Sequence, residues 1–315
     1  MFQVTVPATS ANVGAGFDCL GLALSMRGSF LFKKRTDQEV KIVGCDPMYC
    51  NKDNLVYVAF QTTLQKANHP NFGVEIDIDC NLPLKRGLGS SAACIVAGCV
   101  GANALMGFPL TTQDIFSIAT EMEGHPDNVA PAIFGGLTLS FMKDNEPIMV
   151  PYTVSSNLHF MVVVPPTTIS TQEAREILPT EVSYADAIFN VSHCAAFLRG
   201  LETGDATLIK QAWGDRLHEP YRKKLIPEYD QLEKLCHEYQ ALALLISGSG
   251  STMLVIADNQ YSLSQIEEKI TSTTDVVCHH VQVEKEGVIL HDMRDYVECV
   301  VVEQYTPEDL PRKKK

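Results

Sequence analysis

The sequence predicts a globular protein that mixes helices and strands and forms one large or two medium-sized domains. Apolar and polar residues alternate at 74–80, which is typical of a half-buried strand, and the small and apolar run at 92–105 is typical of a buried helix. The chain has 315 residues, 45% of them hydrophobic and 20% charged. A chain of this length and composition can bury a sizeable core.

The composition also narrows the functional class. A formal net charge of −13 argues against a surface for nucleic acid or anionic membrane. No apolar run approaches the ~20 residues needed to cross a bilayer, and the N-terminus does not resemble a signal peptide. The ten cysteines are scattered without a Cys-x-x-Cys pair, which favours reduced thiols over disulfides or zinc ligands. We therefore expect a cytoplasmic enzyme or binding protein.

The first half of the chain is predicted to begin with a strand at 2–6. A loop at 7–18 follows, because this stretch is rich in glycine and small polar residues. Further elements are expected as strands at 20–24, 29–33 and 137–141 and helices at 54–67 and 111–122, with N-caps at Asp53 or Asn54 and at Thr112. A polar loop at 121–132, with carboxylates, a histidine and an asparagine, is a plausible site or simply the end of a helix.

The pattern restarts around 144–151, and we place a domain boundary there, giving domains 1–150 and 151–315. The second domain is predicted to contain strands at 158–164, 241–246, 253–256 and 276–283 and helices at 171–178, 185–202, 206–213, 225–239 and 261–270. A glycine turn at 247–252 separates the two middle strands.

A strand, a glycine-rich turn and a helix start follow one another directly around residues 83–93. Gly87 and Gly89 would let the backbone approach a ligand, and the first N–H groups of a helix favour an anion. One hypothesis is that this turn holds the phosphates of a nucleotide. The alternative is an ordinary turn in which Ser90 or Ser91 caps the helix. No P-loop or Rossmann spacing is present, so the residues elsewhere must decide.

Three glycine-containing stretches near residues 10, 90 and 250 resemble the motifs of the GHMP small-molecule kinases. The central Pro-x-x-x-Gly-x-Gly-Ser-Ser-Ala-Ala matches in full, and the segments at 7–18, 125–132, 170–175 and 218–222 are similar to homoserine kinases within that family. The resemblance covers roughly residues 2–290, so the residues beyond form a short C-terminal extension. It implies an α+β, two-domain GHMP kinase fold, with an N-terminal half like domain 2 of ribosomal protein S5 and a ferredoxin-like C-terminal half.

The implied activity is transfer of a phosphoryl group from ATP to the side-chain hydroxyl of L-homoserine, a step of threonine biosynthesis. By this resemblance, ATP is held by Pro83, Leu84, Lys85, Arg86, Gly87, Leu88, Gly89, Ser90, Ser91, Ala92 and Ala93, with Asn54 at the adenine. Mg²⁺ takes few protein ligands, all oxygens, and the resemblance assigns it to Ser91 and Glu123. A carboxylate at a helix C-terminus opposes the helix dipole, which supports a functional role for Glu123.

The resemblance also assigns residues to the acceptor. A zwitterion needs a cation for its carboxylate, and Arg175 and Arg222 match the positions for that role. Asp18 would take the ammonium, and Asn12 and His125 would bind the substrate by hydrogen bonds. No Asp–Lys pair is apparent as a base, so the hydroxyl proton is expected to pass to the phosphate while Asn12 holds the oxygen.

Three further points stay open at the level of sequence. The segment between Glu123 and His125 is shorter than in some members of the family, which leaves the direction of His125 undecided. The 247–252 turn either braces the phosphate loop or is a plain hairpin turn. The chain could form a homodimer, and nothing in the sequence decides this.

Two rival functions also remain. One is another GHMP activity, a mevalonate-type kinase or an ATP-dependent decarboxylase. The other is a non-catalytic metabolite-sensing protein on the same fold. The paired Arg175 and Arg222 suit an amino acid, and the presence of Ser91 and Glu123 argues against a sensor.

Overall fold

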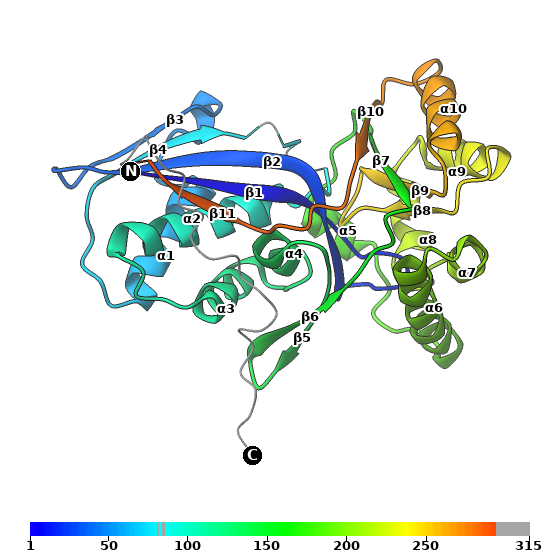
Figure 1. Cartoon of the computed structure of the whole chain (residues 1–315), viewed down its shortest axis with the longest axis horizontal. Coiled ribbons are helices and arrows are strands. Elements are labelled where there is room, and N and C mark those ends of the chain that lie inside the picture. Colours follow the sequence, from blue (N-terminus) through cyan, green and yellow to red (C-terminus); the bar gives the residue numbers. More distant parts are fainter. Residues whose placement is uncertain (81, 84–85, 294–315) are drawn as a thin grey trace.

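The computed structural model describes residues 1–80, 82–83 and 86–293, which form two sheets with helices packed against them (Figure 1). Leu84 and Lys85 of the predicted ATP loop lie outside the described residues, as does the extension after residue 293. Within the described part, no helix is both long and apolar enough to span a membrane.

The first sheet is built on a long N-terminal hairpin, in which β1 (Phe2–Ala11) pairs antiparallel with β2 (Leu20–Lys34). The sheet runs in the order β11-β1-β2-β4-β3, and β5 pairs with both β2 and β6. Its other strands are β3 (Val40–Val43), β4 (Val74–Asp79), β5 (Leu137–Lys143), β6 (Glu146–Tyr152) and β11 (Ile289–Asp292).

Two sequence expectations for this hairpin were wrong. Residues 20–24 and 29–33 belong to one continuous strand, and residues 7–11 of the predicted loop are part of β1. The register shifts between Pro7 and Ala8, so the proline lies at a bulge, where a missing N–H is tolerated. The small residues that suggested a loop are buried, and their size suits a strand that packs closely beneath helices.

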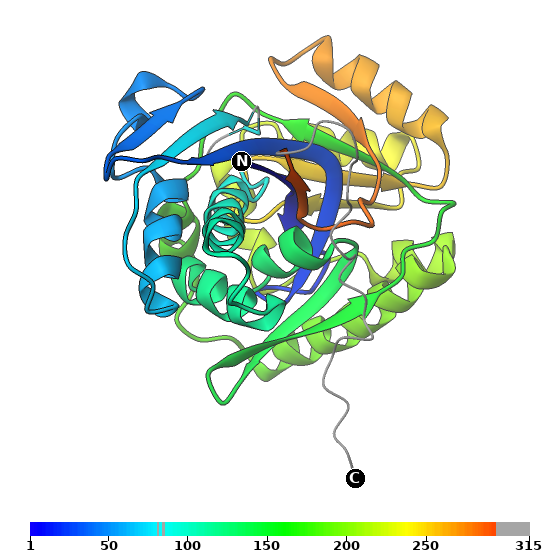
Figure 2. The ribbon, with the colours of Figure 1, turned by 60° about the vertical axis from the view of Figure 1, so that its left-hand side comes forward.

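Four helices cover one face of this sheet: α1 (Leu55–Lys66), α2 (Ser90–Met106), α3 (Thr112–Glu123) and α4 (Val129–Phe134) (Figures 1 and 2). Asn54 caps α1 by accepting the N–H of Val56 at 3.0 Å. The predicted cap of α3 was wrong by one residue, because Thr111 and Asp114 form a reciprocal capping box. Helix α4 was missed, since its start was included in the predicted polar loop.

The second sheet has the order β10-β7-β9-β8 and is antiparallel throughout. Its strands are β7 (His159–Val164), β8 (Ala243–Ile246), β9 (Met253–Ala257) and β10 (Val277–Val281), and its helices are α5 (Thr171–Glu176), α6 (Tyr184–Thr203), α7 (Ala206–Ala212), α8 (Glu219–Arg222), α9 (Tyr229–Glu238) and α10 (Gln260–Thr271). Short 3-10 turns occur at Pro47–Tyr49 and Lys223–Leu225. This strand order and connectivity are ferredoxin-like, as expected.

Both faces of the second sheet are buried, which explains the uninterrupted apolar sequence of β7. Phe160 and Val162 pack into the core shared with the first sheet, whereas Met161 and Val163 face a second core that includes residues of α9 and α10. The division near residue 150 stays a prediction. It falls near the end of β6 and before β7, while β11 returns to pair with β1.

Candidate functional site

A cavity of about 220 Å³ lies where the glycine loop, the turn of the N-terminal hairpin, α5 and α8 meet. It is lined by Asn12, Asp18, Arg86, Gly87, Gly89, Ser90, Ser91, Glu123, His125, Asp127, Asn128, Ser170, Thr171, Arg175, Arg222, Gly248 and Ser249. Every residue that the sequence assigned to the acceptor or the metal is in this lining. The structure therefore brings together segments that are far apart in the chain.

The glycine loop presents the start of α2 to this cavity. Gly89 precedes the helix with φ 65°, in the left-handed region, and makes no side-chain cap. Ser90 and Ser91 are themselves helical, so the alternative in which one of them caps the helix is wrong. Among the described residues, no side chain caps the first N–H groups of α2, and such groups together with the helix dipole favour an anion.

Close packing requires glycine in this loop. A Cβ on Gly89 would lie 1.9 Å from Thr9 Oγ1, and one on Gly87 would lie 2.0 Å from the carbonyl oxygen of Ser247. Ser247 Oγ also donates to the carbonyl of Gly87 at 2.5 Å. The 247–252 turn therefore connects β8 to β9 and braces the glycine loop, which confirms the first of its two interpretations.

The predicted ATP residues divide into two groups. Those that line the cavity are Arg86, Gly87, Gly89, Ser90 and Ser91. Leu88, Ala92 and Ala93 are fully buried in the hydrophobic core, and Pro83 is not part of the lining. The side chains of Leu88, Ala92 and Ala93 therefore hold the loop in place from behind.

Asn54 is not brought into the cavity lining. Its side-chain oxygen caps α1, and its Nδ2 donates to the carbonyl of Tyr49 at 2.9 Å. Only 8% of Asn54 is exposed. Its polar groups thus serve the local turn, and the adenine contact stays a prediction without support from the cavity.

Ser91 and Glu123 lie together at the edge of the glycine loop. Ser91 Oγ donates to Glu123 Oε2 at 2.7 Å. Burial raises the pKa of Glu123, and the bond from Ser91 offsets this only in part. No group of three or more His, Cys, Asp or Glu side chains in the described residues could hold a metal ion. Two oxygen ligands fit Mg²⁺, which completes its coordination with phosphate and water.

The loop between β1 and β2 carries two residues in an uncommon conformation. Asn12 and Asp18 have φ of 60° and 55°, which non-glycine residues adopt rarely and often at functional sites. Asn12 Oδ1 accepts the N–H of Asp18 at 2.9 Å, and Asn12 Nδ2 donates to the carbonyl of Gly248 at 2.8 Å. Asn12 therefore folds its own loop and ties it to the second sheet.

Asp18 and Arg175 form a two-pronged ion pair. Both guanidinium nitrogens of Arg175 donate to the Asp18 carboxylate, each at 3.0 Å, and the bond raises the pKa of Arg175. The side chain of Arg175 is 41% exposed and that of Asp18 is 36% exposed, so this pair is accessible from the cavity. One positive and one negative group thus stand side by side where the sequence expected the ends of a zwitterion.

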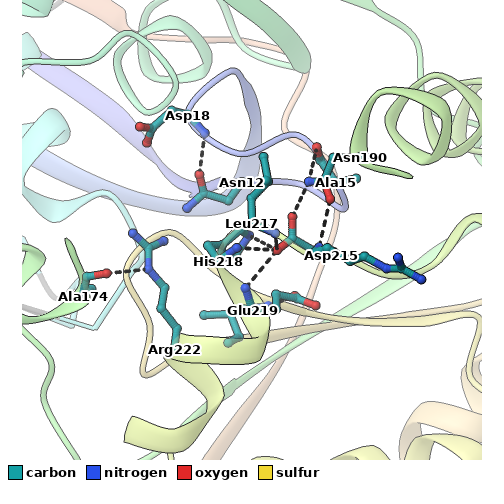
Figure 3. A network of polar contacts seen from close by, with 12 residues as sticks. Asn12, Ala15, Asp18, Ala174, Asn190, Asp215, Leu217, His218, Glu219 and Arg222 are labelled. Carbon is teal, nitrogen blue, oxygen red and sulfur yellow. Dashed lines mark hydrogen bonds and ion pairs between the residues drawn. The ribbon is translucent and has the colours of Figure 1, made fainter. Parts of the chain in front are cut away.

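Arg222 is far less accessible than Arg175. It is 2% exposed, and its Nε donates to the carbonyl of Ala174 at 2.9 Å (Figure 3). Its Nη1 donates to the carbonyl of Gly248 at 3.0 Å. Burial lowers its pKa to about 10. The guanidinium remains charged at neutral pH and keeps further N–H groups for a ligand.

His125 is fixed through one ring nitrogen. Its Nδ1 hydrogen bonds to Oδ1 of Asp127, and the same oxygen accepts the N–H of Asn128 at 2.9 Å. Burial lowers the pKa of His125, but the bond and charge of Asp127 outweigh burial, so the pKa is raised. Nε2 makes no hydrogen bond within the described residues. The short segment after Glu123 therefore holds the ring through Asp127.

Several lining residues were not singled out from the sequence as site residues, among them Asp127, Asn128, Ser170, Thr171 and Gly248. Thr9 was also missed. Its Oγ1 donates to Asn128 Oδ1 at 2.7 Å and so connects β1 to the polar loop. A signal existed for Ser170, because Ser-x-x-Glu before a helix is a capping box, and this one is formed.

Comparison with known proteins gives a consistent set of similarities. The model of the GHMP kinases N terminal domain matches residues 54–136, and that of the GHMP kinases C terminal matches residues 197–275. The chain is 42% identical over 256 residues to a homoserine kinase of Clostridium botulinum strain 657, covering 81% of this chain and 86% of that protein. It is 37% identical over 299 residues to that of strain Kyoto, covering 93% of this chain and 100% of that protein.

A solved structure agrees with these sequence similarities. The crystal structure of homoserine kinase from Cytophaga hutchinsonii superimposes with a TM-score of 0.83 at 30% sequence identity, covering 92% of this chain and 96% of that one. The α+β fold class is thereby confirmed.

Proposed function

The chain belongs to the homoserine kinases of the GHMP family, and we propose that it transfers the γ-phosphoryl group of ATP to the side-chain hydroxyl of L-homoserine. One observation carries the proposal. A single cavity joins an uncapped helix start, suited to phosphates, to an Asp–Arg pair whose charges match an amino acid. The product, O-phospho-L-homoserine, would belong to threonine biosynthesis.

The donor half of the site is the start of α2. The backbone N–H groups from Gly87 to Ser91 would hold the β and γ phosphates of ATP. Ser91 and Glu123 would hold Mg²⁺, which when bound neutralises phosphate charge. The contact between Ser91 and Glu123 in the cavity lining supports this assignment, because it places two oxygen ligands side by side at the glycine loop.

The acceptor half is the Asp18–Arg175 pair. We propose that the ammonium of homoserine binds Asp18 and its carboxylate binds Arg175, so that the substrate opens the ion pair and satisfies both partners. Arg222 would add positive charge near the carboxylate from its buried position. A mevalonate-type acceptor has no ammonium and would leave Asp18 without a cation.

The reaction needs positioning more than a strong base. The acceptor oxygen would form a bond to the γ phosphorus as the bond to the β–γ bridging oxygen breaks, with ADP leaving and the hydroxyl proton passing to the transferred phosphate. Asn12 would hold the acceptor hydroxyl, and Nε2 of His125 is available for a further hydrogen bond. Among the described residues, the cavity lining contains no lysine that could act as a base.

An ADP-release assay tests the proposal with homoserine, serine, mevalonate and galactose as acceptors, each with and without Mg²⁺. We expect homoserine to give the highest kcat/KM and turnover to disappear without the metal. Stimulation by none of the four acceptors would contradict a kinase function, and a preference for mevalonate or galactose would assign the chain another GHMP activity.

A further inference from the structure

A buried polar contact lies behind the acceptor half of the cavity, outside its lining (Figure 3). Asp215 Oδ2 accepts a hydrogen bond from Asn190 Nδ2 at 2.6 Å. Asp215 Oδ1 accepts three backbone N–H groups, those of Leu217 at 2.9 Å, His218 at 2.6 Å and Glu219 at 2.9 Å. The side chain of Asp215 thereby fixes the start of α8.

Asn190, on α6, extends this contact toward the loop between β1 and β2. Its Nδ2 also donates to the carbonyl of Ala15 at 3.3 Å, and its Oδ1 accepts the N–H of Arg216 at 2.9 Å. Asn190 is 4% exposed and Asp215 is 8% exposed. Because both amide hydrogens and the oxygen of Asn190 are engaged, this one side chain holds α6, α8 and the loop in register.

The same loop rests on the start of α8 through aromatic contacts. The ring of Phe17 stacks on that of His218, with centroids 5.1 Å apart, and the guanidinium of Arg222 lies 5.2 Å from the Phe17 ring. Phe17 directly precedes Asp18. A shift of α8 relative to the loop would therefore move the ion-pairing carboxylate as well.

The proposed substrate-binding side chains of Asn12 and Arg222 share one hydrogen-bond acceptor. The carbonyl of Gly248 receives hydrogen bonds from both Asn12 at 2.8 Å and Arg222 at 3.0 Å. Asn12 comes from the loop and Arg222 from α8. Asn190 and Asp215 hold these two elements together from the opposite side.

We propose that Asn190 and Asp215 are positioning residues for the amino acid acceptor, an inference that rests on the function proposed above. They set the position of the loop that carries Asn12 and Asp18 relative to the helix that carries Arg222. The glycine loop is held by other contacts, the N–H of Thr9 with the carbonyl of Leu88 and Ser247 with Gly87, which include neither residue. Removing the side chain of Asn190 or Asp215 therefore weakens the binding of the amino acid acceptor rather than that of ATP.

The test compares Asn190→Ala with a matched control, Asn103→Ala. Asn103 is also a buried helical asparagine, 4% exposed, and its amide exchanges two hydrogen bonds of 3.0 Å with the backbone of Leu110. It lies near the end of α2, roughly 20 Å along the helix axis from Ser90. Steady-state kinetics for both substrates and thermal unfolding are measured for both variants.

We expect Asn190→Ala to raise KM for homoserine roughly tenfold to a hundredfold, with KM for ATP changed by less than about twofold. Asn103→Ala should lower the unfolding temperature and leave both KM values unchanged. If Asn190→Ala leaves both KM values unchanged, or raises both equally, the positioning role is overturned.

A second test exchanges the side chains at positions 190 and 215. It remains informative even if Asn190→Ala does not fold. Asn190→Asp places two carboxylates together, and Asp215→Asn places two amide groups together. The double variant restores one donor–acceptor pair between the two positions. We expect it to have a lower KM for homoserine than Asn190→Asp alone, and an equal or higher KM would overturn the inference.

The wild-type measurement separates the two proposals. A wild type with no turnover of homoserine contradicts the proposed function, and this inference falls with it. An active wild type whose Asn190 and Asp215 variants retain the wild-type KM for homoserine contradicts the positioning role alone.

Discussion

At the scale of single residues, the protonation of titratable groups near the cavity depends on their burial. Glu219, at the start of α8, is 5% exposed, and its Oε1 accepts the N–H of Ile246 at 2.8 Å. Burial raises its pKa to about 8; the bond from Ile246 and the charge of Lys223 oppose this, while Asp215 and Glu233 raise it further. Glu219 is thus largely neutral at pH 7, and it lies outside the cavity lining.

Glu219→Gln tests this state through the pH dependence of stability. The pKa of Glu219 is about 8 in the folded state against an ordinary value of 4.5, so the folded protein retains a proton that the unfolded chain loses. The resulting stabilisation is complete below pH 4.5 and is lost as pH rises from 4.5 to 8. The variant keeps the acceptor oxygen but does not titrate.

Denaturant unfolding at pH 5, 6, 7 and 8 measures the difference. The free energy of unfolding of the wild type should fall relative to that of Glu219→Gln across this range. Parallel curves for the two proteins would show that Glu219 is ionised in the folded state.

At the scale of elements, α2 controls the donor half of the site, and glycine bounds it at both ends. Gly89 precedes the helix with φ 65°, and Gly107 follows it with φ 86°. A Cβ on Gly107 would have no atom within 4 Å, whereas one on Gly89 would lie 1.9 Å from Thr9 Oγ1. The two positions share the backbone strain and differ in steric overlap.

Substituting alanine at Gly89 and at Gly107 therefore separates the cost of backbone strain from the cost of steric overlap. Gly107→Ala should cost about 1–2 kcal/mol of stability, from the left-handed backbone alone, and leave KM for ATP unchanged. Gly89→Ala should cost more and raise KM for ATP at least about tenfold, because the glycine loop must move away from β1. Thermal unfolding and ATP kinetics measure both effects, and equal behaviour of the two variants would contradict a special fit at Gly89.

Some helices and strands could be predicted from the sequence and others could not. The glycine turn and the body of α2 were predictable, because the turn residues and the apolar run are contiguous, although the helix begins at Ser90 rather than at the predicted residue 92. The strand through residues 7–11 was not, since its small residues look like a loop until the packing above them is known. Helix α4 was missed because Pro131 and the polar residues before it suggested a break, although a proline fits a first helical turn.

At the scale of the whole molecule, the site depends on contacts between distant segments. The resemblance named Asp18 and Arg175, but not that they pair with each other across 157 residues. Asn190 and Asp215 were not singled out from the sequence, because both lie outside the cavity lining and Asn190 bonds Ala15 from 175 residues away. Such partners depend on the packing of α6 and α8 against the N-terminal hairpin, which local patterns do not reveal.

We propose that one cavity combines a phosphate-binding helix start with a site for both charges of an amino acid. Measuring kcat/KM for L-homoserine against two analogues, 4-hydroxybutanoate without the ammonium and 3-aminopropan-1-ol without the carboxylate, tests this proposal. Because Asp18 or Arg175 would be left without its partner, each analogue should be phosphorylated at least about a hundredfold less efficiently. Equal kcat/KM for homoserine and either analogue would contradict the claim.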